Sequence, residues 1–408
     1  MKILLVTEDL PTPHLGGAGK HAVLLGNALI EAGHQVEMLG VLENKMNSTN
    51  NDFLGTLHKE IDLSRTGLKA VAMGIYNPAR NLLLAWRIWC AIKRLEYKRF
   101  DVIHYHGHIA ELGIFVPADV NFVHTLHDQG SECMTNMRFR NGQPCQAKAP
   151  SECASCATAK PNGLQKAVSA TAVILHRYLA RKAFSRHKAI FVSNFLLCRF
   201  KGVVGSNHKL NATVVHNFTD TRLMTNILQE MPAPIPKKSR PVVLIVGRVH
   251  LTKGQDVFLQ SLTDEAIKRI EIRIVGDGPD LAQLRQKHET RGVKFIGWQT
   301  QETVYRETIG ADACVLPSIW EEPCGTTTFE ALALGKTVLA LALGGTPEQA
   351  KYNLFPNQLR LFDNMSALAE AVASIDFSEP ISHVGQAADV RARLPEILDV
   401  YTRIPTHR

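Results

Sequence analysis

The most constraining feature of this sequence is a strand–turn–helix segment that runs from Ala313 to Gly335. Residues 313–317 are apolar, which is typical of a buried strand in a parallel sheet. Pro323 and Gly325 then favour a turn, and residues 326–334 have the composition of a helix that ends at Gly335. A strand followed by a tight turn and a helix is half of a βαβ unit, so the segment predicts an α/β protein.

Two glutamates bracket the turn of this segment. Glu322 lies in the loop after the strand, and Glu330 lies inside the helix. The first turn of the helix has unpaired backbone N–H groups that favour an anion; it contains Gly325, Thr326 and Thr327. Amides suit a phosphate and the two acids can accept hydrogen bonds from hydroxyls, so the segment is a candidate site for a nucleotide sugar. Two solvated acids at a helix end are the alternative interpretation of the spacing alone.

The same alternation of apolar strands and helical stretches recurs on both sides of a proline-rich segment. Residues 226–241 contain Pro232, Pro234, Pro236 and Pro241, which is typical of a linker. With 408 residues, two domains are expected. We predict two doubly wound α/β domains facing a cleft, at residues 1–225 and 242–385, with a helix in residues 386–408 that crosses back to the first domain. Residues 45–78 show little periodicity and are expected to be irregular.

Composition and net charge indicate which classes of partner this chain is expected to bind. The chain is 45% hydrophobic and 21% charged, which is ordinary for a globular protein. A formal charge of +8 suits an acidic partner such as a nucleoside diphosphate or an anionic membrane surface. No basic run with interleaved aromatic residues is present, so nucleic acid is not expected as a partner. The sequence begins as a β-strand and lacks a long apolar run, which predicts a cytoplasmic protein, with the inner face of the plasma membrane as the alternative location.

One predicted helix could pack on the protein core or lie on a membrane surface. Residues 80–100 combine a row of apolar side chains with basic ones, including Arg87, Lys93 and Arg94. A core helix with a solvated basic face is the expected interpretation, and a membrane-surface helix is the alternative.

Glycine and basic residues mark two further strand-to-helix loops. Gly16 and Gly17 follow the first strand, and glycine there lets backbone approach a phosphate or sugar closely. A tight turn is the alternative, and neither the Walker A nor the dinucleotide-binding pattern is present. Arg248 and Lys253 follow the strand that opens the second domain, where a guanidinium and an ammonium could hold phosphate.

Histidines gather near the ends of two strands. His104, His106 and His108 alternate, so a period of two places them on one side of an extended chain. A metal triad is conceivable there, but the stretch lacks carboxylate support. His127 ends the next strand, a position at which parallel sheets commonly place functional residues.

Four cysteines lie in an insertion at residues 131–160: Cys133, Cys145, Cys153 and Cys156. The last two form a C-x2-C pair. Residues 138–150, which lie between Cys133 and Cys153, are polar and rich in turn residues. In a cytosolic chain this grouping favours a structural zinc site over disulfides. Free cysteines in a loop are the alternative.

Taken together, these motifs resemble those of retaining glycosyltransferases of family GT4. The Glu322–Glu330 spacing resembles the family's E-x7-E signature, and the surrounding string from Glu322 to Lys336 fits as well. The segments Asp101–His106, Thr125–His127 and Gly344–Glu348 are also similar to family motifs. The resemblance implies the GT-B fold, with the donor bound by the second domain and the acceptor by the first.

The resemblance also implies roles for the candidate residues. Transfer of a hexosyl group from a nucleotide-diphosphate sugar to a glycan or lipid-linked acceptor is expected, with retained anomeric configuration and no catalytic metal. Arg248 and Lys253 would hold the diphosphate, Glu330 the ribose and Glu322 the donor sugar. His127 would contact the transferred sugar or the acceptor hydroxyl, and the glycine loop would border the same site. Polysaccharide, lipopolysaccharide or glycolipid biosynthesis is the expected context.

Two other classes of function remain open at this stage. A GT-B-fold sugar-nucleotide epimerase would need no external acceptor. A non-catalytic nucleotide-sugar-binding partner in an assembly complex would have no reason to keep Arg248, Lys253, Glu322 and Glu330 together.

Overall fold

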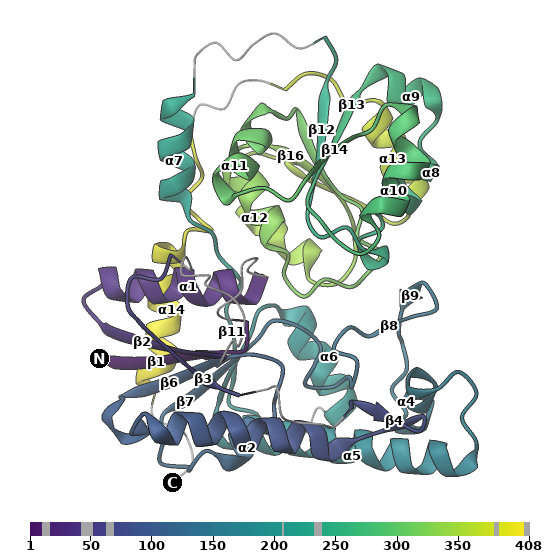
Figure 1. Ribbon diagram of the computed structural model, residues 1–408. Coiled ribbons are helices and arrows are strands. Elements are labelled where there is room, and N and C mark those ends of the chain that lie inside the picture. The colour runs from purple at the N-terminus through teal and green to yellow at the C-terminus, as the bar shows by residue number, and fades with distance from the viewer. Residues whose placement is uncertain are drawn as a thin grey trace. The chain divides into compact units, whose positions relative to one another are not determined.

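A computed structural model describes residues 1–9, 17–41, 52–62, 69–205, 208–231, 239–378 and 383–403. The chain divides into two compact units. Unit 1 comprises Met1–Arg140, Cys145–His216 and Arg393–Arg408, and unit 2 comprises Asn141–Pro144 and Asn217–Ala392. Each unit is built on one large sheet with helices on both faces (Figure 1).

The elements from the N-terminus to residue 214, together with the last helix, belong mainly to unit 1. Its strands are β1 (Lys2–Thr7), β2 (Gln35–Val41), β3 (Thr56–Ile61), β4 (Val71–Ala72), β5 (Ile75–Tyr76), β6 (Val102–His106), β7 (Phe122–Leu126), β8 (Phe139–Arg140), β10 (Lys188–Phe191) and β11 (Ala212–Val214), and β9 (Gln143–Pro144) follows β8. Its helices are α1 (Gly17–Glu31), α2 (Pro78–Arg94), α3 (Leu112–Phe115), α4 (Pro150–Ala157), α5 (Gly163–Arg186), α6 (Asn194–Val204) and α14 (Val390–Thr402), with a 3-10 turn η1 (Tyr97–Arg99).

Unit 2 holds the remaining elements. Its strands are β12 (Val242–Val246), β13 (Glu271–Val275), β14 (Lys294–Gly297), β15 (Ala313–Leu316), β16 (Thr337–Leu341) and β17 (Leu359–Phe362). Its helices are α7 (Thr221–Glu230), α8 (Gln255–Ser261), α9 (Asp264–Arg269), α10 (Leu281–His288), α11 (Gln301–Gly310), α12 (Thr326–Ala333) and α13 (Met365–Ala373), with 3-10 segments η2 (Leu251–Lys253), η3 (Glu289–Arg291) and η4 (Thr346–Tyr352).

Both large sheets are parallel and reverse their strand order near the middle. The order is β11-β10-β7-β6-β1-β2-β3 in unit 1 and β14-β13-β12-β15-β16-β17 in unit 2. The reversal falls between β1 and β6 in the first sheet and between β12 and β15 in the second. In open parallel sheets, ligands bind at the carboxyl ends of the strands at such a switch point. The topology therefore selects the loops after β1, β6, β12 and β15.

The core of unit 2 lies between its sheet and one helical layer. Strand residues such as Val243, Ile245 and Ile274 are buried against Phe258 of α8 and Leu368 of α13. Helices α8, α9, α10 and α13 cover this face of the sheet, and α11 and α12 cover the other (Figure 1). Near-continuous apolar strands buried on both faces are what a parallel sheet between two helical layers requires.

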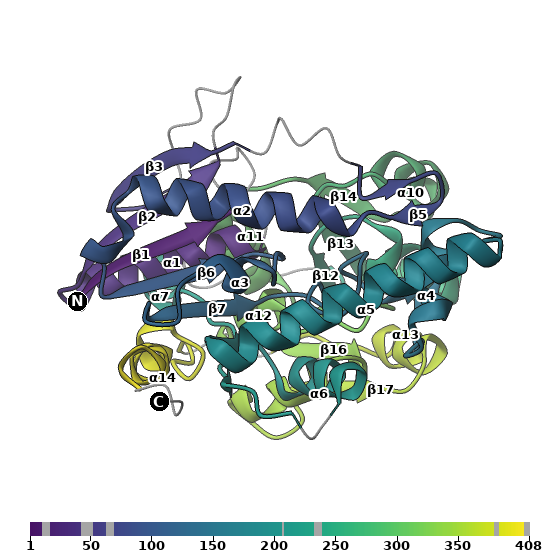
Figure 2. The same cartoon turned by 90° about the horizontal axis from the view of Figure 1, so that it is seen from below.

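In unit 1, α2 and α5 lie side by side across one face of the sheet (Figures 1 and 2). Helix α2 buries Leu84, Ile88 and Ile92 in the core, and Asn77 caps its N-terminus by accepting a hydrogen bond from the Ala79 N–H. The core-helix interpretation of residues 80–100 is confirmed over residues 80–94, since α2 ends at Arg94.

The C-terminal helix returns to unit 1, as predicted. Tyr401 is 2% exposed, and its hydroxyl lies 2.7 Å from Nδ1 of His104 on β6. The Tyr401 carbonyl also accepts hydrogen bonds from Asn121 Nδ2 (2.8 Å) and Lys188 Nζ (3.1 Å). These contacts fix the helix against three strand regions of the sheet.

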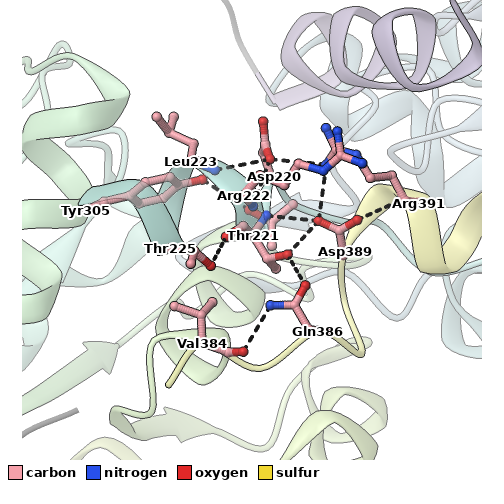
Figure 3. Close-up of polar contacts among 11 residues, drawn as sticks. Asp220, Thr221, Arg222, Leu223, Thr225, Tyr305, Val384, Gln386, Asp389 and Arg391 are labelled. Carbon is pink, nitrogen blue, oxygen red and sulfur yellow. Dashed lines mark hydrogen bonds and ion pairs between the residues drawn. The ribbon is translucent and has the colours of Figure 1, made fainter. Parts of the chain in front are cut away.

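Two segments of unit 2 that continue into unit 1 are tied to each other (Figure 3). Asp389 Oδ2 accepts hydrogen bonds from the Thr221 N–H (3.0 Å) and hydroxyl (2.6 Å), and the same hydroxyl oxygen lies 2.6 Å from Gln386 Oε1. Arg391 lies 3.3 Å from Asp220 and 3.4 Å from Asp389. The side chains of Thr221 and Asp389 are buried, so this network is shielded from water.

The predicted domain boundary needs correction. The units divide between His216 and Asn217, so the first unit ends nine residues before residue 225. Residues 226–230 belong to α7 and not to a linker, because Asp220 caps the helix and its apolar residues Met224 and Ile227 pack on α11. Three of the prolines lie in residues 232–238, outside the described part. The C-terminal helix begins at Val390, four residues after the expected start at 386.

Two further findings complete the fold. Residues 45–78 include β3, an edge strand paired in parallel with β2, so the irregular prediction was wrong there. Across the described ranges, none of the helices combines the length and apolarity needed to span a bilayer.

Candidate functional site

The loops after β12 and β13 in unit 2 pack backbone to backbone. A Cβ atom on Gly276 would lie 2.0 Å from the Gly247 carbonyl oxygen, and one on Gly278 would lie 2.0 Å from the Val249 oxygen. The Val249 N–H donates to the Asp277 carbonyl at 2.9 Å. Glycine is required where backbones approach this closely. The contact fixes the course of the loop that carries Arg248.

This loop presents the two cations identified in the sequence. Arg248 is exposed, and Gln255 Nε2 donates to its backbone carbonyl at 3.0 Å. Lys253 ends η2, which His250 caps by accepting from the Thr252 N–H. The structure thus places both cations in the loop that follows β12, one side of the switch point in unit 2.

The other side of the switch point supplies the partner of Lys253. Its ammonium lies 2.7 Å from Glu322 Oε1, and the two side chains are 28% and 11% exposed. The ammonium also lies 5.6 Å from the centre of the Trp320 ring. Lys253 and Glu322 are 69 positions apart in the sequence, and they meet because the loops after β12 and β15 are adjacent.

Backbone contacts hold these two loops in place. The Thr252 carbonyl accepts hydrogen bonds from the N–H groups of Ile319 and Trp320, both at 3.1 Å. Gly254 has a φ of +67°, and a Cβ there would lie 2.0 Å from the Pro317 oxygen. On the other flank, the Gly345 N–H donates to the Glu322 carbonyl at 2.7 Å. The acid is thus positioned by rigid neighbours on both sides.

The helix after Glu322 begins where the sequence predicted. Gly325 is the N-cap of α12, and the first turn contains Thr326 and Thr327 with no acidic residue. A Cβ on Gly325 would lie 3.0 Å from Glu322 Oε2, so glycine leaves room for this carboxylate. The Gly325 carbonyl accepts from Gln349 Nε2 at 2.8 Å. The free amides of this turn and the helix dipole favour an anion.

Glu330 lies on α12 and contacts α11. Its Oε1 accepts from Gln301 Nε2 at 2.9 Å and lies 3.5 Å from the Tyr305 hydroxyl. Together with Thr327, it lines a small pocket at the carboxyl ends of β12 and β15 that also contains Val246 and Leu316. Gln301 and Tyr305 were not predicted, because nothing in the sequence indicates that α11 packs beside α12.

In unit 1, His127 belongs to a cluster of imidazoles. His127 Nε2 lies 3.2 Å from His106 Nδ1, and the ring centres of His21 and His127 are 4.7 Å apart. His106 is 1% exposed, and its Nε2 has no hydrogen-bond partner among the residues that the structure describes. Of the predicted glycines, Gly17 opens α1, which carries His21, and Gly16 lies outside the described residues.

The buried imidazoles of His21 and His106 favour the neutral form near pH 7. Burial, followed by the charges of neighbouring histidines, lowers the pKa of His21 and His106 well below the usual value. The pKa of His104 is lowered by the same causes. His104 bonds to Thr125 and to Tyr401 of the C-terminal helix, each at 2.7 Å. Neutral imidazoles can accept a proton, donate one, or bind a transition metal.

The conceivable triad of His104, His106 and His108 is not formed. In the described ranges, the one group of three metal-ligating side chains with ligand atoms within 4.8 Å is His21, His106 and His127. His108 instead lies with its Nδ1 2.8 Å from Asp128 Oδ2. The carboxylate support that the strand lacks comes from the end of the neighbouring strand.

Asp128 gives His108 a different charge from the other histidines. The hydrogen bond to Asp128 raises the pKa of His108 to about 10, against the opposing effect of burial. Asp128 Oδ1 also accepts from the Gly130 N–H at 2.7 Å, which aims the carboxylate. The sequence placed Asp128 directly after His127 but gave no sign of its partner.

We predict that His108 stays protonated across neutral pH and that its pairing stabilises the fold in that range. Because its pKa is raised in the folded state, the contribution is complete below the unfolded value of about 6.5. It is lost as the pH rises toward about 10. NMR titration of labelled histidines should show one imidazole titrating near pH 10, and Asp128→Asn should return it toward 6.5. A wild-type His108 that titrates near 6.5 would contradict the pairing.

Two family models cover most of the chain. One described as "Glycosyltransferase Family 4" matches residues 15–223, which is 209 of the 408 residues. One described as "Glycosyl transferases group 1" matches residues 240–375. Among curated proteins, an uncharacterized 42.6 kDa protein in the cps region of Klebsiella pneumoniae is 23% identical over 88% of this chain and 89% of its own length. Glycogen synthase from Mycobacterium tuberculosis is 24% identical over 98% and 92%.

Solved structures support the fold. Anabaena HepE in complex with UDP and glucose aligns with a TM-score of 0.64 at 15% identity, covering 99% of this chain and 100% of that one. WaaG, a glycosyltransferase involved in lipopolysaccharide biosynthesis, aligns with a TM-score of 0.60 at 15% identity, covering 98% and 99%. These likenesses establish two Rossmann-like sheets of the GT-B type. With the family match over more than half of its length, the chain is a glycosyltransferase that belongs to glycosyltransferase family 4.

Proposed function

We propose that this protein transfers a hexosyl group from a nucleoside-diphosphate sugar to a glycan or lipid-linked acceptor, with retained configuration and without a catalytic metal. The observation that carries the proposal is the Lys253–Glu322 ion pair at the switch point of unit 2. It joins a cation suited to a diphosphate to an acid suited to a sugar, beside a helix N-terminus without acidic residues.

Stabilisation of the leaving group is the main task of unit 2 in this reaction. Negative charge grows on the nucleoside diphosphate as the glycosidic bond breaks. Arg248, Lys253 and the amides of the first turn of α12 are fixed positive groups that can offset this charge, and such preorganised groups contribute strongly to catalysis. They would take the part that a metal ion plays in other transferases. The structurally similar HepE, which was solved with UDP and glucose, supports a nucleotide-sugar donor.

The two glutamates would divide the donor between them. Glu330 is oriented by Gln301, which leaves its carboxylate able to accept from ribose hydroxyls. Glu322 is oriented by Lys253 and would accept from hydroxyls of the donor sugar, which aligns the ring for transfer.

His127 would serve the acceptor side. Its Nε2 lies 3.2 Å from Nδ1 of His106, whose pKa is lowered by burial. An imidazole can hydrogen-bond a hydroxyl of the acceptor or of the transferred sugar. Gly17, at the start of α1, would border the same site.

Cell-surface glycan assembly at the cytoplasmic face of the membrane is the proposed setting. The relative encoded in a cps region and the likeness to WaaG, an enzyme of lipopolysaccharide biosynthesis, support a polysaccharide or lipopolysaccharide context. Helix α5 adds a candidate membrane contact, since it exposes large apolar side chains among basic ones. The exposed apolar residues are Leu164, Val168, Ile174, Leu175 and Tyr178, and exposed Lys166 and Lys182 lie on the same helix.

The test of this function is a donor panel followed by product analysis. Purified protein is incubated with UDP-, GDP- and ADP-linked hexoses, first alone and then with glycan and lipid-linked acceptors. We expect thermal stabilisation by one donor and acceptor-dependent product formation. NMR coupling constants of the new linkage should give the anomeric configuration of the donor. An inverted linkage excludes the retaining reaction, and a sugar isomer formed from donor alone indicates an epimerase.

We predict that Arg248→Ala and Lys253→Ala each reduce transition-state stabilisation by about 2–4 kcal/mol, as for other single electrostatic donors. The reason is the loss of one fixed positive group near the leaving diphosphate. The measurement is kcat/KM for the donor identified above. Lys287→Ala is the matched control, because Lys287 pairs with Asp256 on α8 and not with the candidate site.

Metal dependence is tested in the same assay. Activity should persist after removal of divalent ions, and circular dichroism shows whether the chelator unfolds the protein. Two results would contradict metal-independent binding of the diphosphate by Arg248 and Lys253. One is full turnover in both cation variants, and the other is complete loss of activity in chelated protein that remains folded.

We further predict that Glu330→Ala weakens the binding of free nucleoside diphosphate, while Glu322→Ala mainly lowers kcat. The difference follows from their proposed roles, since Glu330 would bind the ribose and Glu322 the donor sugar. Isothermal titration with the nucleoside diphosphate and steady-state kinetics separate the two effects. Glu302→Ala is the control, because Glu302 is exposed on α11 and pairs with Arg306. Equal loss of diphosphate affinity in the Glu322 and Glu330 variants would overturn the division.

A further inference from the structure

The fold brings all four cysteines of the insertion into one neighbourhood of unit 1. Cys153 and Cys156 lie on α4 and pack on a small cluster with Tyr76 and Val173. Met134, next to Cys133, packs on the same cluster, and Arg138 lies 3.4 Å from Glu132 and donates to the Cys145 carbonyl at 3.1 Å. All four sulfur-bearing residues are half-buried. Thiols from three separate stretches of chain thus converge where no disulfide is formed.

Buried cations on α5 and in the loop hold the backbone of this insertion. Arg177 is 6% exposed and donates to the carbonyls of Glu132 (3.0 Å) and Lys148 (2.7 Å). Arg138 is 3% exposed and donates to the carbonyls of Cys145 (3.1 Å) and Ala147 (3.0 Å). These contacts fix the stretches that carry the cysteines, although the insertion has few apolar residues of its own.

The charge around the thiols is suited to an anionic metal centre. Arg177 Nη2 lies 3.8 Å from Cys153 Sγ. Arg140 donates to Ser155 Oγ at 2.7 Å and acts electrostatically on Cys156. A zinc ion with four thiolates carries a net charge of 2−, which is costly to bury without nearby positive groups. Two guanidinium groups beside the C-x2-C pair supply them.

We infer that Cys133, Cys145, Cys153 and Cys156 bind one structural zinc ion. On binding, the four thiols release four protons to solvent and form four Zn–S bonds, with no change in oxidation state. In the structure, no three of the sulfur atoms lie within 4.8 Å of one another. Rotation of the cysteine side chains must therefore bring them to the S–S separation of about 3.8 Å that Zn–S bonds of about 2.3 Å require.

The ion would order the segment that follows the candidate acceptor residue. The insertion begins three residues after Asp128, and the Gly130 carbonyl lies 2.8 Å from Nε2 of buried His176 on α5. Zinc at the far end of the insertion would complete this anchoring, because a segment without a core gains its order from the metal. This role rests on the chain's own fold and not on the proposed reaction.

The experiment is metal analysis of protein purified without a histidine tag. Inductively coupled plasma mass spectrometry should find about one zinc ion per chain in the wild type. Cys153→Ser/Cys156→Ser should lose it. The matched control is Cys90→Ser/Cys198→Ser, which removes two cysteines outside the insertion and should keep it. Cobalt substitution should give the thiolate-to-metal charge-transfer absorption of a sulfur-ligated site.

The imidazole cluster is the competing site for a metal. Zinc retained by the double serine variant but lost by His106→Asn would overturn the inference, since the ion would then be bound by histidines. If the serine variant does not fold, the zinc content and thiol reactivity of the wild type alone test the inference. Zinc-free wild type, with all four thiols reactive under native conditions, also overturns it. These readouts do not involve sugar transfer, so their failure is separate from failure of the proposed function.

Discussion

The candidate site depends on one topological constraint, the reversal of strand order in each parallel sheet. The helices that follow β12 and β15 lie on opposite faces of the sheet, while the loops directly after these two strands meet at its carboxyl edge. The loop after β12 carries the cations and the loop after β15 carries Glu322. Lys253 and Glu322 are far apart in the sequence. Their contact exists because adjacent parallel strands end at the same edge.

The two units share this topology, but the charges at their switch points differ. At the switch point of unit 2, exposed and half-buried cations stand beside a helix N-terminus. At the switch point of unit 1, burial keeps His21, His104 and His106 neutral, and the charged His108 is matched by Asp128. In the proposed reaction, the cations of unit 2 would suit a diphosphate and the neutral histidines of unit 1 would suit a hydroxyl group.

Much of the fold and of the donor site could be predicted from sequence because both depend on local patterns. The strand, turn and helix from Ala313 to Gly335 are each encoded by adjacent residues, so the positions of Glu322 and Glu330 followed. Strand β3 was missed because an edge strand needs fewer apolar residues. Residues 226–230, the second half of α7, fall within the predicted linker because the prolines beyond the helix outweigh the capping Asp220 and the two apolar residues that pack on α11.

The partners of the site residues could not be predicted in the same way. The imidazoles of His21 and His106 meet only because α1 packs over β6, and Gln301 meets Glu330 only because α11 packs beside α12. Both are tertiary contacts between segments far apart in the chain. Alternation did place His104 and His106 on one face, but it also grouped His108 with them. The chain leaves the strand after His106, and His108 turns instead to the carboxylate at the end of β7.

In the proposed reaction, Lys253 both holds the loop after β12 in place and binds the donor. Its ammonium already contacts a carboxylate, and both side chains are partly shielded from water, so their attraction is screened less than that of a surface pair. An ammonium has three donors and can therefore bind a phosphate oxygen without releasing Glu322. Glu322 Oε2, which faces Gly325, then remains available for a sugar hydroxyl. In the proposed reaction, one ion pair thus fixes the distance between the diphosphate and the sugar, which explains why a glycine at 325 and a lysine at 253 belong to the same design.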